Sequence, residues 1–370
     1  MKQFLDLGLQ PVANGFLTEG QIKDEKFYPL EVGYDEETQL ISLMDVVDKR
    51  TLFNDKYPFI TGQSQGMITH FKDTARTFQL DKLADSHSLV VEIGCNDGSF
   101  LRNFKHQVGI EPCGNIAQLA RDNGIDNVYN KFLSRELMDD ILVAHGRPKL
   151  VFAANTICHI EDINMVFETI SDALRDDGWF VFEDPHWLDI LTQVSYDQIY
   201  DEHVHYFCAQ SVFKLAKKHG MYLDHTENLS VHGGEVRYYI RKGTSPDYMA
   251  KSPAYGFDDC ELFARRVEES RDKLLTALDN TGKIWAYGAT SKSTVIYNYC
   301  GIGPDQLEYI TDTTPNKIGL LSPGTHIPII DPTSREHGST AFLAAWNHRK
   351  EIESKETNWI NDGGKYITHI

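Results

Sequence analysis

The sequence predicts an α/β protein in which a central, doubly wound, mainly parallel sheet follows an N-terminal lobe and precedes a second, smaller αβ domain. From residue 89 onward, short apolar runs alternate with helical segments, which is typical of a parallel sheet covered by helices on both faces. A long amphipathic helix is predicted over residues 257–280, where Gly282 ends it, and a further strand and helix pattern follows. We therefore expect three parts, at residues 1–75, 76–245 and 246–370.

The central unit is expected to begin with a helix over residues 64–83. After it we predict strand 89–93, a helix that begins after Gly98, strand 107–110, helix 114–123, strand 127–129, helix 134–144, strand 150–154, helix 163–175 and strand 179–184. Ligands bind such sheets at the carboxyl ends of the strands. Residues 94–98, Glu111, residues 155–159 and residues 183–186 are therefore expected to share one rim.

The second αβ unit is expected to begin with a strand over residues 283–287 that runs into a helix, and further strands are predicted at 308–311, 340–345 and 365–369. Backbone N–H groups at a helix N-terminus, with a lysine beside them, suit a diphosphate group. The alternative is a strand-to-helix turn that simply needs a glycine. Arg237 is a further candidate to bind phosphate or carboxylate. The residues predicted to bind substrate are Gly288, Ala289, Thr290, Lys292 and Arg237.

Composition excludes several classes of protein. The chain has 370 residues, of which 41% are hydrophobic, and a formal net charge of −18, so polyanions are repelled and nucleic acid is not an expected partner. No apolar run approaches the roughly 20 residues of a membrane span, and the N-terminal residues do not read as a signal peptide, so we expect a cytoplasmic protein. The six cysteines show no C-x-x-C spacing, which favours reduced thiols over disulfides or zinc.

Residues 91–98, VEIGCNDG, form the most informative motif. An apolar run carrying Glu92 leads into a turn with glycines at positions 94 and 98, whereas a dinucleotide-binding loop would also have glycine at the position of Asn96. Acidic groups beside the loop disfavour a phosphate and suit a cofactor with a positive centre and hydroxyl groups. Glu111 ends the next strand nineteen residues after Glu92, where a ribose-binding carboxylate is expected.

This motif resembles the first motif of the S-adenosylmethionine-dependent methyltransferases. The resemblance implies a Rossmann-like cofactor domain and S-adenosylmethionine as the methyl donor. The residues expected to line the cofactor site are Glu92, Gly94, Asn96, Gly98, Glu111, Pro112, Phe132 and Asn155.

Histidines stand beside other proton-handling groups in three segments, residues 153–160, 200–207 and 232–239. Imidazole can take up a proton at neutral pH, although most of the 15 histidines are expected to be ordinary surface or core residues. His159 follows the fourth strand, on the expected rim, and Tyr200, Glu202 and His203 cluster within four residues. A zinc site at His203 and His205 lacks a third ligand at suitable spacing, so no metal is predicted there.

Seven separated motifs then agree, in order, with one family. They are FLDLGLQPVANGFL, EIGCNDGSFL, ANTICHI, YDEH, HGGEVR, YGATSK, and SPGTHIPI with AAWNHRKEI. Together they resemble the C-methyltransferases that act on nucleotide-linked deoxysugars. That resemblance implies a dTDP-linked 4-keto-6-deoxysugar as the typical substrate, methylated at carbon 3, and a nucleotide-sugar site in the C-terminal domain.

The resemblance also implies roles for particular residues. His203 matches the family's base, which removes the proton from the carbon beside the ketone. His159, Tyr200 and Glu202 match residues around the sugar, to which we assign orientation of the base and stabilisation of the enolate. Tyr57 resembles a substrate-facing tyrosine of the N-terminal region, although Phe59 is close enough to fit the same alignment.

Two departures from the family pattern stand out. Relatives usually hold zinc with four cysteines in the first part of the chain, but no cysteine precedes Cys95, so we predict no zinc and an N-terminal lobe held by packing. Asp201 stands where many relatives have histidine, and its charge would raise the pKa of His203 if the two approached. The alternatives are an N- or O-methyltransferase acting on a related nucleotide sugar, and a non-catalytic nucleotide-sugar-binding protein.

Overall fold

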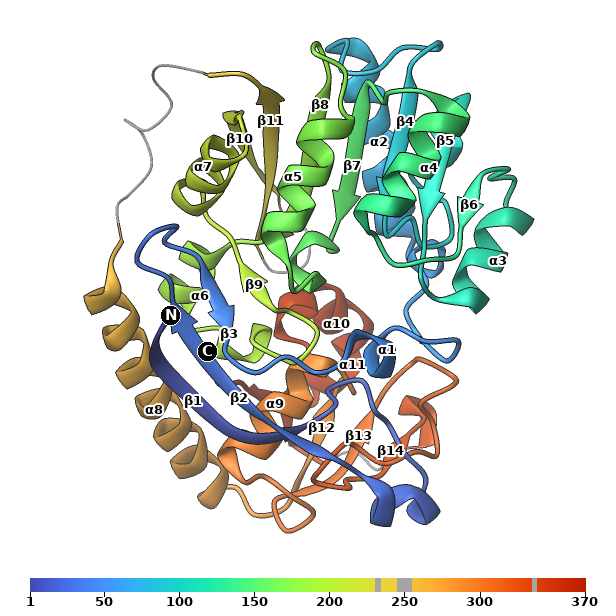
Figure 1. The fold of residues 1–370 in the computed structure, drawn as a ribbon. Helices are drawn as coiled ribbons and strands as arrows, with labels where there is room; N and C mark the ends of the chain where they lie inside the picture. Colours follow the sequence, from blue (N-terminus) through green and yellow to red (C-terminus); the bar gives the residue numbers. More distant parts are fainter. Residues whose placement is uncertain (230–233, 245–254, 335–337) are drawn as a thin grey trace.

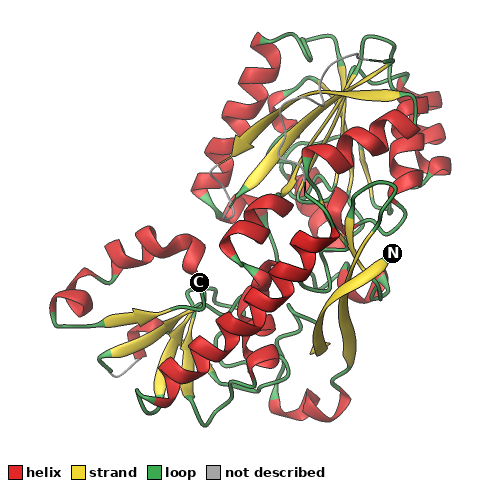
Figure 2. Cartoon of the chain, turned by 90° about the vertical axis from the view of Figure 1, so that its left-hand side faces the viewer, coloured by secondary structure: helices red, strands yellow, loops and turns green. Residues whose placement is uncertain are grey.

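Three sheets organise the chain in the computed structural model, which describes residues 1–229, 234–244, 255–334 and 338–370 (Figure 1). A seven-stranded sheet forms one layer, a four-stranded N-terminal sheet lies beneath it, and a five-stranded sheet belongs to the C-terminal part. Figure 2 shows the seven- and five-stranded sheets as separate bodies, with a long helix running between them. None of the described helices is both long and apolar enough to cross a bilayer.

The seven-stranded sheet has the order β10-β11-β8-β7-β4-β5-β6. Its strands are β4 (Leu89–Ile93), β5 (His106–Ile110), β6 (Val128–Tyr129), β7 (Leu150–Ala154), β8 (Trp179–Pro185), β10 (Met221–Leu229) and β11 (Glu235–Lys242). Strands β4 to β8 are parallel, whereas β11 runs antiparallel to β8 and places Glu235 beside Pro185. The amino end of β11 therefore meets the carboxyl ends of the parallel strands.

Helices cover this sheet on both faces, as expected for a doubly wound fold. They are α2 (Gln65–Leu80), α3 (Gly114–Asp122), α4 (Arg135–His145), α5 (Ile163–Ala173) and α7 (Ala209–Lys218), whereas α6 (Trp187–Gln193) packs with the N-terminal sheet. The predicted strands and helices between residues 64 and 184 are confirmed to within three residues, with one exception.

The exception is the helix predicted directly after Gly98. The chain forms only a 3-10 turn there, Leu101–Asn103, and Phe104 is already extended. The next strand begins at His106, which leaves too little chain for an α-helix. The Phe100 ring instead packs into the core, 4.0 Å from the ring of Phe152.

The N-terminal sheet is antiparallel and has the order β1-β2-β3-β9. Its strands are β1 (Lys2–Pro11), β2 (Phe27–Tyr34), β3 (Ile41–Leu43) and β9 (His205–Tyr206), and the short helix α1 (Lys49–Leu52) follows β3. Strand β9 comes from the segment directly after His203, and the sequence did not reveal this pairing. The base candidate is thus held where the N-terminal sheet meets the central unit.

The C-terminal sheet is parallel, with the order β14-β13-β12-β15-β16. Its elements are β12 (Ile284–Tyr287), β13 (Leu307–Thr311), β14 (Ile329–Ile330), β15 (Thr340–Leu343), β16 (Lys365–Ile367), α8 (Phe257–Asp279), α9 (Ser291–Cys300), α10 (Arg349–Lys355) and α11 (Thr357–Asn361). The predicted second αβ unit and its long leading helix are therefore confirmed.

One hydrophobic core joins the N-terminal sheet to the C-terminal part. Leu7 and Val32 of the N-terminal sheet belong to the same buried cluster as Phe263 of α8 and Val295 of α9. Burial of apolar side chains at this junction supplies the main driving force for its packing. The six cysteines are buried free thiols.

Candidate active site

Two glycines shape the loop after β4. Gly94 and Gly98 have φ angles of +70° and +78°, a region that side chains other than glycine rarely adopt. A Cβ at Gly94 would lie 2.3 Å from Thr156 Oγ1, and one at Gly98 would lie 2.4 Å from Ile125 Cγ1. Both positions therefore require glycine, for space as well as for conformation.

Glu111 fixes the loop from the neighbouring strand end. Its Oε2 accepts the N–H of Asn96 at 3.1 Å, and its Oε1 accepts the N–H of Cys113 at 2.9 Å. Burial raises the pKa of Glu111, while these two N–H groups oppose the rise. A carboxylate held in this way keeps lone pairs for the hydroxyl groups of a ribose, in agreement with its predicted position.

Glu92 is 3% exposed and lies beneath the loop. Burial, followed by the charges of Asp97 and Glu111, raises its pKa well above 4.5. Its Oε2 has no hydrogen-bond partner among the described residues. This acidic surrounding fits a cationic sulfonium cofactor better than a phosphate.

A segment of the N-terminal part covers the cofactor rim, and the sequence gave no indication of it. Asp55 Oδ1 accepts the N–H of Gly114 at 2.9 Å, and the Thr61 N–H donates to Asn96 Oδ1 at 2.9 Å. Asn115 Nδ2 donates to the Tyr57 carbonyl at 3.3 Å. Residues 55–61 are thereby tied to both loops on which the cofactor is expected to lie.

The other predicted cofactor residues lie at the same rim or next to it. The Pro112 carbonyl accepts from Asn130 Nδ2 at 2.8 Å, and the half-buried Phe132 ring lies under the Lys49 ammonium at 4.9 Å. Asn155 directly follows β7 with a φ of +48°, and its N–H donates to the Glu183 carbonyl at 2.7 Å.

Four aromatic rings from three chain segments line the acceptor side of the rim. The Phe53 and His159 rings stack with centroids 5.2 Å apart, and His159 stacks on His203 at 5.3 Å. The Tyr200 ring packs against His203 with centroids 4.1 Å apart. The structure thus brings together three of the residues predicted for chemistry, and it adds Phe53, which the sequence did not single out.

Hydrogen bonds set the tautomer of His203. The Gln198 carbonyl lies 3.1 Å from Nδ1, and because a carbonyl only accepts, Nδ1 carries the hydrogen. In the neutral ring, Nε2 then offers its lone pair to the Tyr200 hydroxyl, 2.8 Å away. A histidine oriented by a backbone acceptor, with Nε2 basic, has the arrangement of a general base.

His159 stacks between Phe53 and His203. Burial lowers its pKa to about 4, so the ring is neutral at pH 7. Its Nε2 is buried and has no hydrogen-bond partner within the described part of the chain. The ring can therefore meet a ligand that approaches the acceptor side.

Glu202 connects the N-terminal and C-terminal parts to this site. Its Oε1 accepts from Asn14 Nδ2 at 2.7 Å, and its Oε2 accepts from the Tyr57 hydroxyl at 3.3 Å. Burial raises the pKa of Glu202, and the Lys317 ammonium opposes the rise. Burial, then the Glu202 charge, raises the pKa of Tyr57 well above 10. Asn14 was not predicted, because it lies 188 residues from Glu202 in the sequence.

Asp201 turns away from the rings and toward the N-terminal lobe. Its Oδ1 accepts the Ala13 N–H at 3.1 Å, and it is 6% exposed. Burial, then the neighbouring Glu202 charge, raises its pKa to about 8. The predicted effect of Asp201 on the pKa of His203 stays a prediction.

Cys158, His159 and His203 present ligand atoms within 4.8 Å of one another. The sequence spacing did not reveal this group. His203 already uses both ring nitrogens in the hydrogen bonds to Tyr200 and Gln198, and burial beside Asp184 raises the pKa of the Cys158 thiol well above 9. His205, the other histidine of the rejected zinc pair, contacts Ser42 and the Glu161 carbonyl instead.

The turn predicted to hold a diphosphate is only partly open to a ligand. Gly288 has a φ of +97°, and the Ala289 N–H already donates to Asp312 Oδ2 at 2.8 Å. The Thr290 hydroxyl accepts the Ser293 N–H at 3.1 Å as the helix cap. Lys292 is half-buried, with its ammonium over the Trp346 ring at 5.3 Å and the charges of Asp197 and Glu235 acting on it. A carboxylate thus takes one of the N–H groups expected to bind phosphate.

Arg237 does not reach the cleft, which corrects its assignment to the substrate. It is 3% exposed and its guanidinium donates to Glu183 at 2.7 Å, Glu227 at 2.6 Å and Thr74 at 2.7 Å. These partners come from β8, β10 and α2, so the guanidinium is held between the edge of the sheet and α2. Of the same motif, His232 and Gly233 lie outside the described residues.

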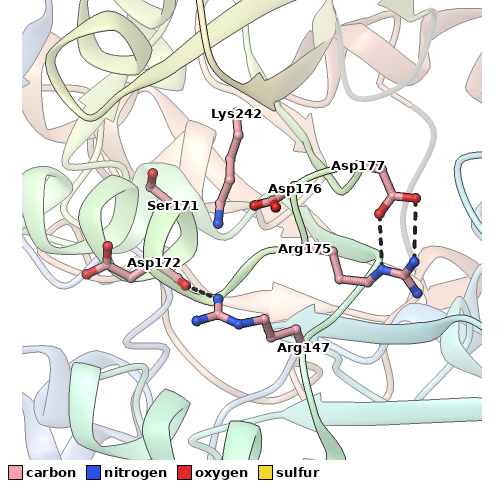
Figure 3. A pocket seen from close by; sticks show the side chains of 7 residues that line it. All are labelled: Arg147, Ser171, Asp172, Arg175, Asp176, Asp177 and Lys242. Atoms are coloured by element: carbon pink, nitrogen blue, oxygen red, sulfur yellow. Dashed lines mark hydrogen bonds and ion pairs between the residues drawn. The ribbon is translucent and has the colours of Figure 1, made fainter.

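A surface pocket lies at the opposite end of the strands (Figure 3). Its cations serve the protein itself: the Arg147 guanidinium donates to the Asp172 carbonyl, and Lys242 Nζ donates to the Leu174 carbonyl at 2.6 Å. Arg175 pairs with Asp177 at 3.0 Å. These contacts close the C-terminal end of α5, so the pocket does not compete with the rim as a candidate active site.

Comparisons with known proteins agree with this geometry. Residues 67–226 match the model of a methyltransferase domain, and residues 230–370 match the model of the C-methyltransferase C-terminal domain. The chain is 28% identical over 389 residues to the C-methyltransferase NovU of Streptomyces niveus, covering 99% of this chain and 92% of that relative. The protein is an S-adenosylmethionine-dependent methyltransferase.

Other relatives of this methyltransferase match only part of it. A sarcosine/dimethylglycine N-methyltransferase of Halorhodospira halochloris is 24% identical over 202 residues, which is 50% of this chain and 69% of that relative. A solved S-adenosylmethionine-dependent methyltransferase from Clostridium acetobutylicum has a TM-score of 0.36 and 14% identity, and covers 47% of this chain and 92% of its own. A possible histamine N-methyltransferase from Thermotoga maritima has a TM-score of 0.36 and 17% identity, and the match covers 48% of this chain and 91% of that protein.

Residues 1–53 match the model of a putative zinc binding domain. This stretch contains neither cysteine nor histidine. Structural zinc sites in proteins use thiolate and imidazole ligands, so the residues present do not fit one. The absence of zinc from this methyltransferase stays a prediction.

Proposed function

We propose that this methyltransferase transfers a methyl group to the carbon beside the ketone of a nucleotide-linked 4-keto-deoxysugar, at carbon 3. The observation that carries the proposal is His203, whose Nδ1–H is held by the Gln198 carbonyl and whose Nε2 lone pair accepts from the Tyr200 hydroxyl. A C–H bond beside a carbonyl has to lose its proton before the carbon becomes a nucleophile.

The chemistry assigns one task to each nearby group. Nε2 of His203 takes the proton from the substrate carbon, and the C–H electron pair moves into an enolate. Tyr200, whose hydroxyl donates to Nε2 at 2.8 Å, turns this hydrogen bond to the sugar when the substrate binds, and the proton taken by Nε2 stays on the imidazolium until it passes to water. The enolate carbon forms the new C–C bond with the methyl group that S-adenosylmethionine supplies when bound, and the broken S–C bond leaves its electrons on sulfur.

The growing charge on the enolate oxygen requires a hydrogen-bond donor. His159 fits this task because burial keeps its ring neutral, with a pKa of about 4, and because its Nε2 lacks a partner among the described residues. A neutral imidazole N–H can stabilise an enolate without losing its own proton. Glu202 would position Tyr57 and the sugar through the contacts already described.

The comparisons support the C-methylation part of the proposal through the C-terminal domain model and the likeness to NovU. The nucleotide sugar rests on the resemblance of the seven motifs to the deoxysugar C-methyltransferases. A cytoplasmic location and the division at residues 75 and 245 belong to the same proposal.

A panel of nucleotide-linked 4-keto-6-deoxysugars, incubated with the protein and methyl-labelled S-adenosylmethionine, tests it directly. We expect label in a C-methyl group beside the ketone of at least one dTDP-linked sugar, located by NMR. Label on oxygen or nitrogen would replace the proposal with an O- or N-methyltransferase. Binding of the sugars without transfer under these conditions would favour the non-catalytic alternative.

A further inference from the structure

Glu235 is a buried carboxyl group that none of the predicted roles uses. It is the first residue of β11, is 1% exposed, and lies beside Pro185 at the carboxyl end of β8. Neither of its carboxylate oxygens has a hydrogen bond of normal geometry among the described residues, although the Asn155 side chain lies close enough to act on its pKa. A buried polar group without a partner is destabilising, so its presence calls for a reason outside the folded chain alone.

The neighbours of Glu235 place it between the central unit and the C-terminal part. The Asn155 side chain approaches it from the end of β7, the His70 charge acts on it from α2, and the Lys292 charge acts on it from α9. On a third side its charge acts on the Cys158 thiol, whose sulfur is within 4.8 Å of the ring nitrogens of His159 and His203. Glu235 therefore faces the same space as the proposed base.

This space is the acceptor half of the rim. The cofactor loops follow β4 and β5, whereas Glu235 stands on β11, three strands from β4 in the sheet order. Burial and the nearby Glu183 charge raise the pKa of Glu235 to about 7, so the group is partly ionised at neutral pH and accepts hydrogen bonds readily.

The charge of Lys292 decides what kind of group fits. A cationic amine beside Glu235 would be repelled by the Lys292 ammonium. A hydroxyl group both donates and accepts, so it can donate to the Glu235 carboxylate and accept from a cation next to it. Sugars carry such groups on the carbons that flank a ketone.

We propose that Glu235 binds a hydroxyl group of the acceptor sugar and thereby selects the acceptor of this methyltransferase. The inference rests on the proposed function, since it takes a keto sugar as the acceptor. Glu235 is then a substrate-contacting residue at the acceptor end of the cleft, separate from the base and from the cofactor loops.

Pairing variants of the enzyme with variants of the substrate tests this contact. The full-length protein and its E235A and E235Q variants are titrated, with S-adenosylhomocysteine present, with dTDP-4-keto-6-deoxyglucose and with its 2-deoxy and 3-deoxy analogues. Dissociation constants are measured by calorimetry and kcat/KM by methyl transfer. E227Q is the matched control, because Glu227 lies on the same hairpin with a side chain 47% exposed and pairs with Arg237 away from the cleft.

We expect E235A to lower the affinity for the parent sugar by about 10- to 100-fold, which is the range for the loss of a hydrogen bond to a charged group. For the analogue that lacks the contacted hydroxyl, E235A is expected to change the affinity by less than about threefold. The interaction between Glu235 and the hydroxyl is already absent in that analogue, so removing the carboxylate costs little more. The affinity of E235Q for the parent sugar should lie between those of E235A and the wild type, and E227Q should bind the sugar like the wild type. All variants should bind S-adenosylhomocysteine with unchanged affinity.

Three results would overturn the inference. If E235A lowers the affinity equally for the parent sugar and for both analogues, Glu235 has a structural role. In that case E235Q would also unfold at a lower temperature than the wild type. A tenfold loss of S-adenosylhomocysteine affinity would assign Glu235 to the cofactor. If the wild-type protein binds and turns over none of the sugars, the proposed acceptor class itself is wrong and the inference falls with it.

Discussion

Replacing Asp201 with asparagine is expected to stabilise the protein at neutral and alkaline pH. The Asp201 carboxyl is 6% exposed next to Glu202, and burial followed by that charge raises its pKa from 3.8 to about 8. Between these two values the folded state holds a proton that the unfolded state has released. The contribution of Asp201 to stability is therefore fully present below pH 4, is lost as the pH rises through this window, and levels off above about pH 8.

The structure also gives the size of the effect. One proton held only by the folded state changes the free energy of unfolding by about 1.4 kcal/mol per pH unit, which is about 3 kcal/mol between pH 5 and pH 7. Because Glu202 shares the ionisation, we take this as the upper limit. Asparagine keeps an oxygen that can accept the Ala13 N–H, now 3.1 Å from Oδ1, so the D201N variant changes the charge and little else.

Urea unfolding of the wild type and D201N at pH 5, 6, 7 and 8 measures the difference. We expect the gain in stability of D201N over the wild type to grow from pH 5 to pH 8. Curves that stay parallel over this range would refute the reasoning, since they would mean that Asp201 has its ordinary pKa in the folded protein.

Three further predictions concern the buried hydrogen bonds of Arg237, the cofactor site and zinc. The R237M variant should lose about 3 kcal/mol of stability, because the buried Glu183 charge loses its Arg237 partner and keeps only His70, 2.7 Å away. Preserved stability together with lost sugar affinity would instead support the predicted contact of Arg237 with phosphate. E111Q should weaken S-adenosylhomocysteine binding about tenfold in calorimetry, since it replaces a charged acceptor by a neutral one, and unchanged binding would remove Glu111 from the cofactor site. Elemental analysis of the purified protein should find no stoichiometric zinc, and treatment with EDTA should leave the melting temperature unchanged; one zinc per chain would show that other ligands replace the cysteines.

Local signals were sufficient for the cofactor half of the site. Gly94, Gly98 and Glu111 lie at strand ends whose order and spacing follow from short apolar runs, so the sequence pattern places them on one rim. Tyr200 and His203 are three residues apart, and a single turn brings their side chains together at 2.8 Å. In both cases the geometry depends on chain segments of a few residues.

The acceptor half depends on packing between distant segments, which no local pattern encodes. Phe53 and Asn14 reach the site only because the N-terminal sheet pairs with β9 and shares a core with α8 and α9. Glu235 and Arg237 show that a shift of two residues along one strand decides whether a side chain lies at the rim or in the interior. Both point to the same face of β11, yet the first stands at the strand end, and the second lies under α2, where Glu183 and Thr74 take its guanidinium.

The central claim is that His203 removes a proton from carbon, and hydrogen exchange tests it most directly. The protein is incubated in D2O with S-adenosylhomocysteine and a dTDP-linked 4-keto-6-deoxysugar, and NMR follows the hydrogen on the carbon beside the ketone. We predict exchange with the wild type and its loss in H203A, while the variant still binds S-adenosylhomocysteine with wild-type affinity. Exchange that persists in H203A, or C-methyl transfer by that variant at the wild-type rate, would contradict the account.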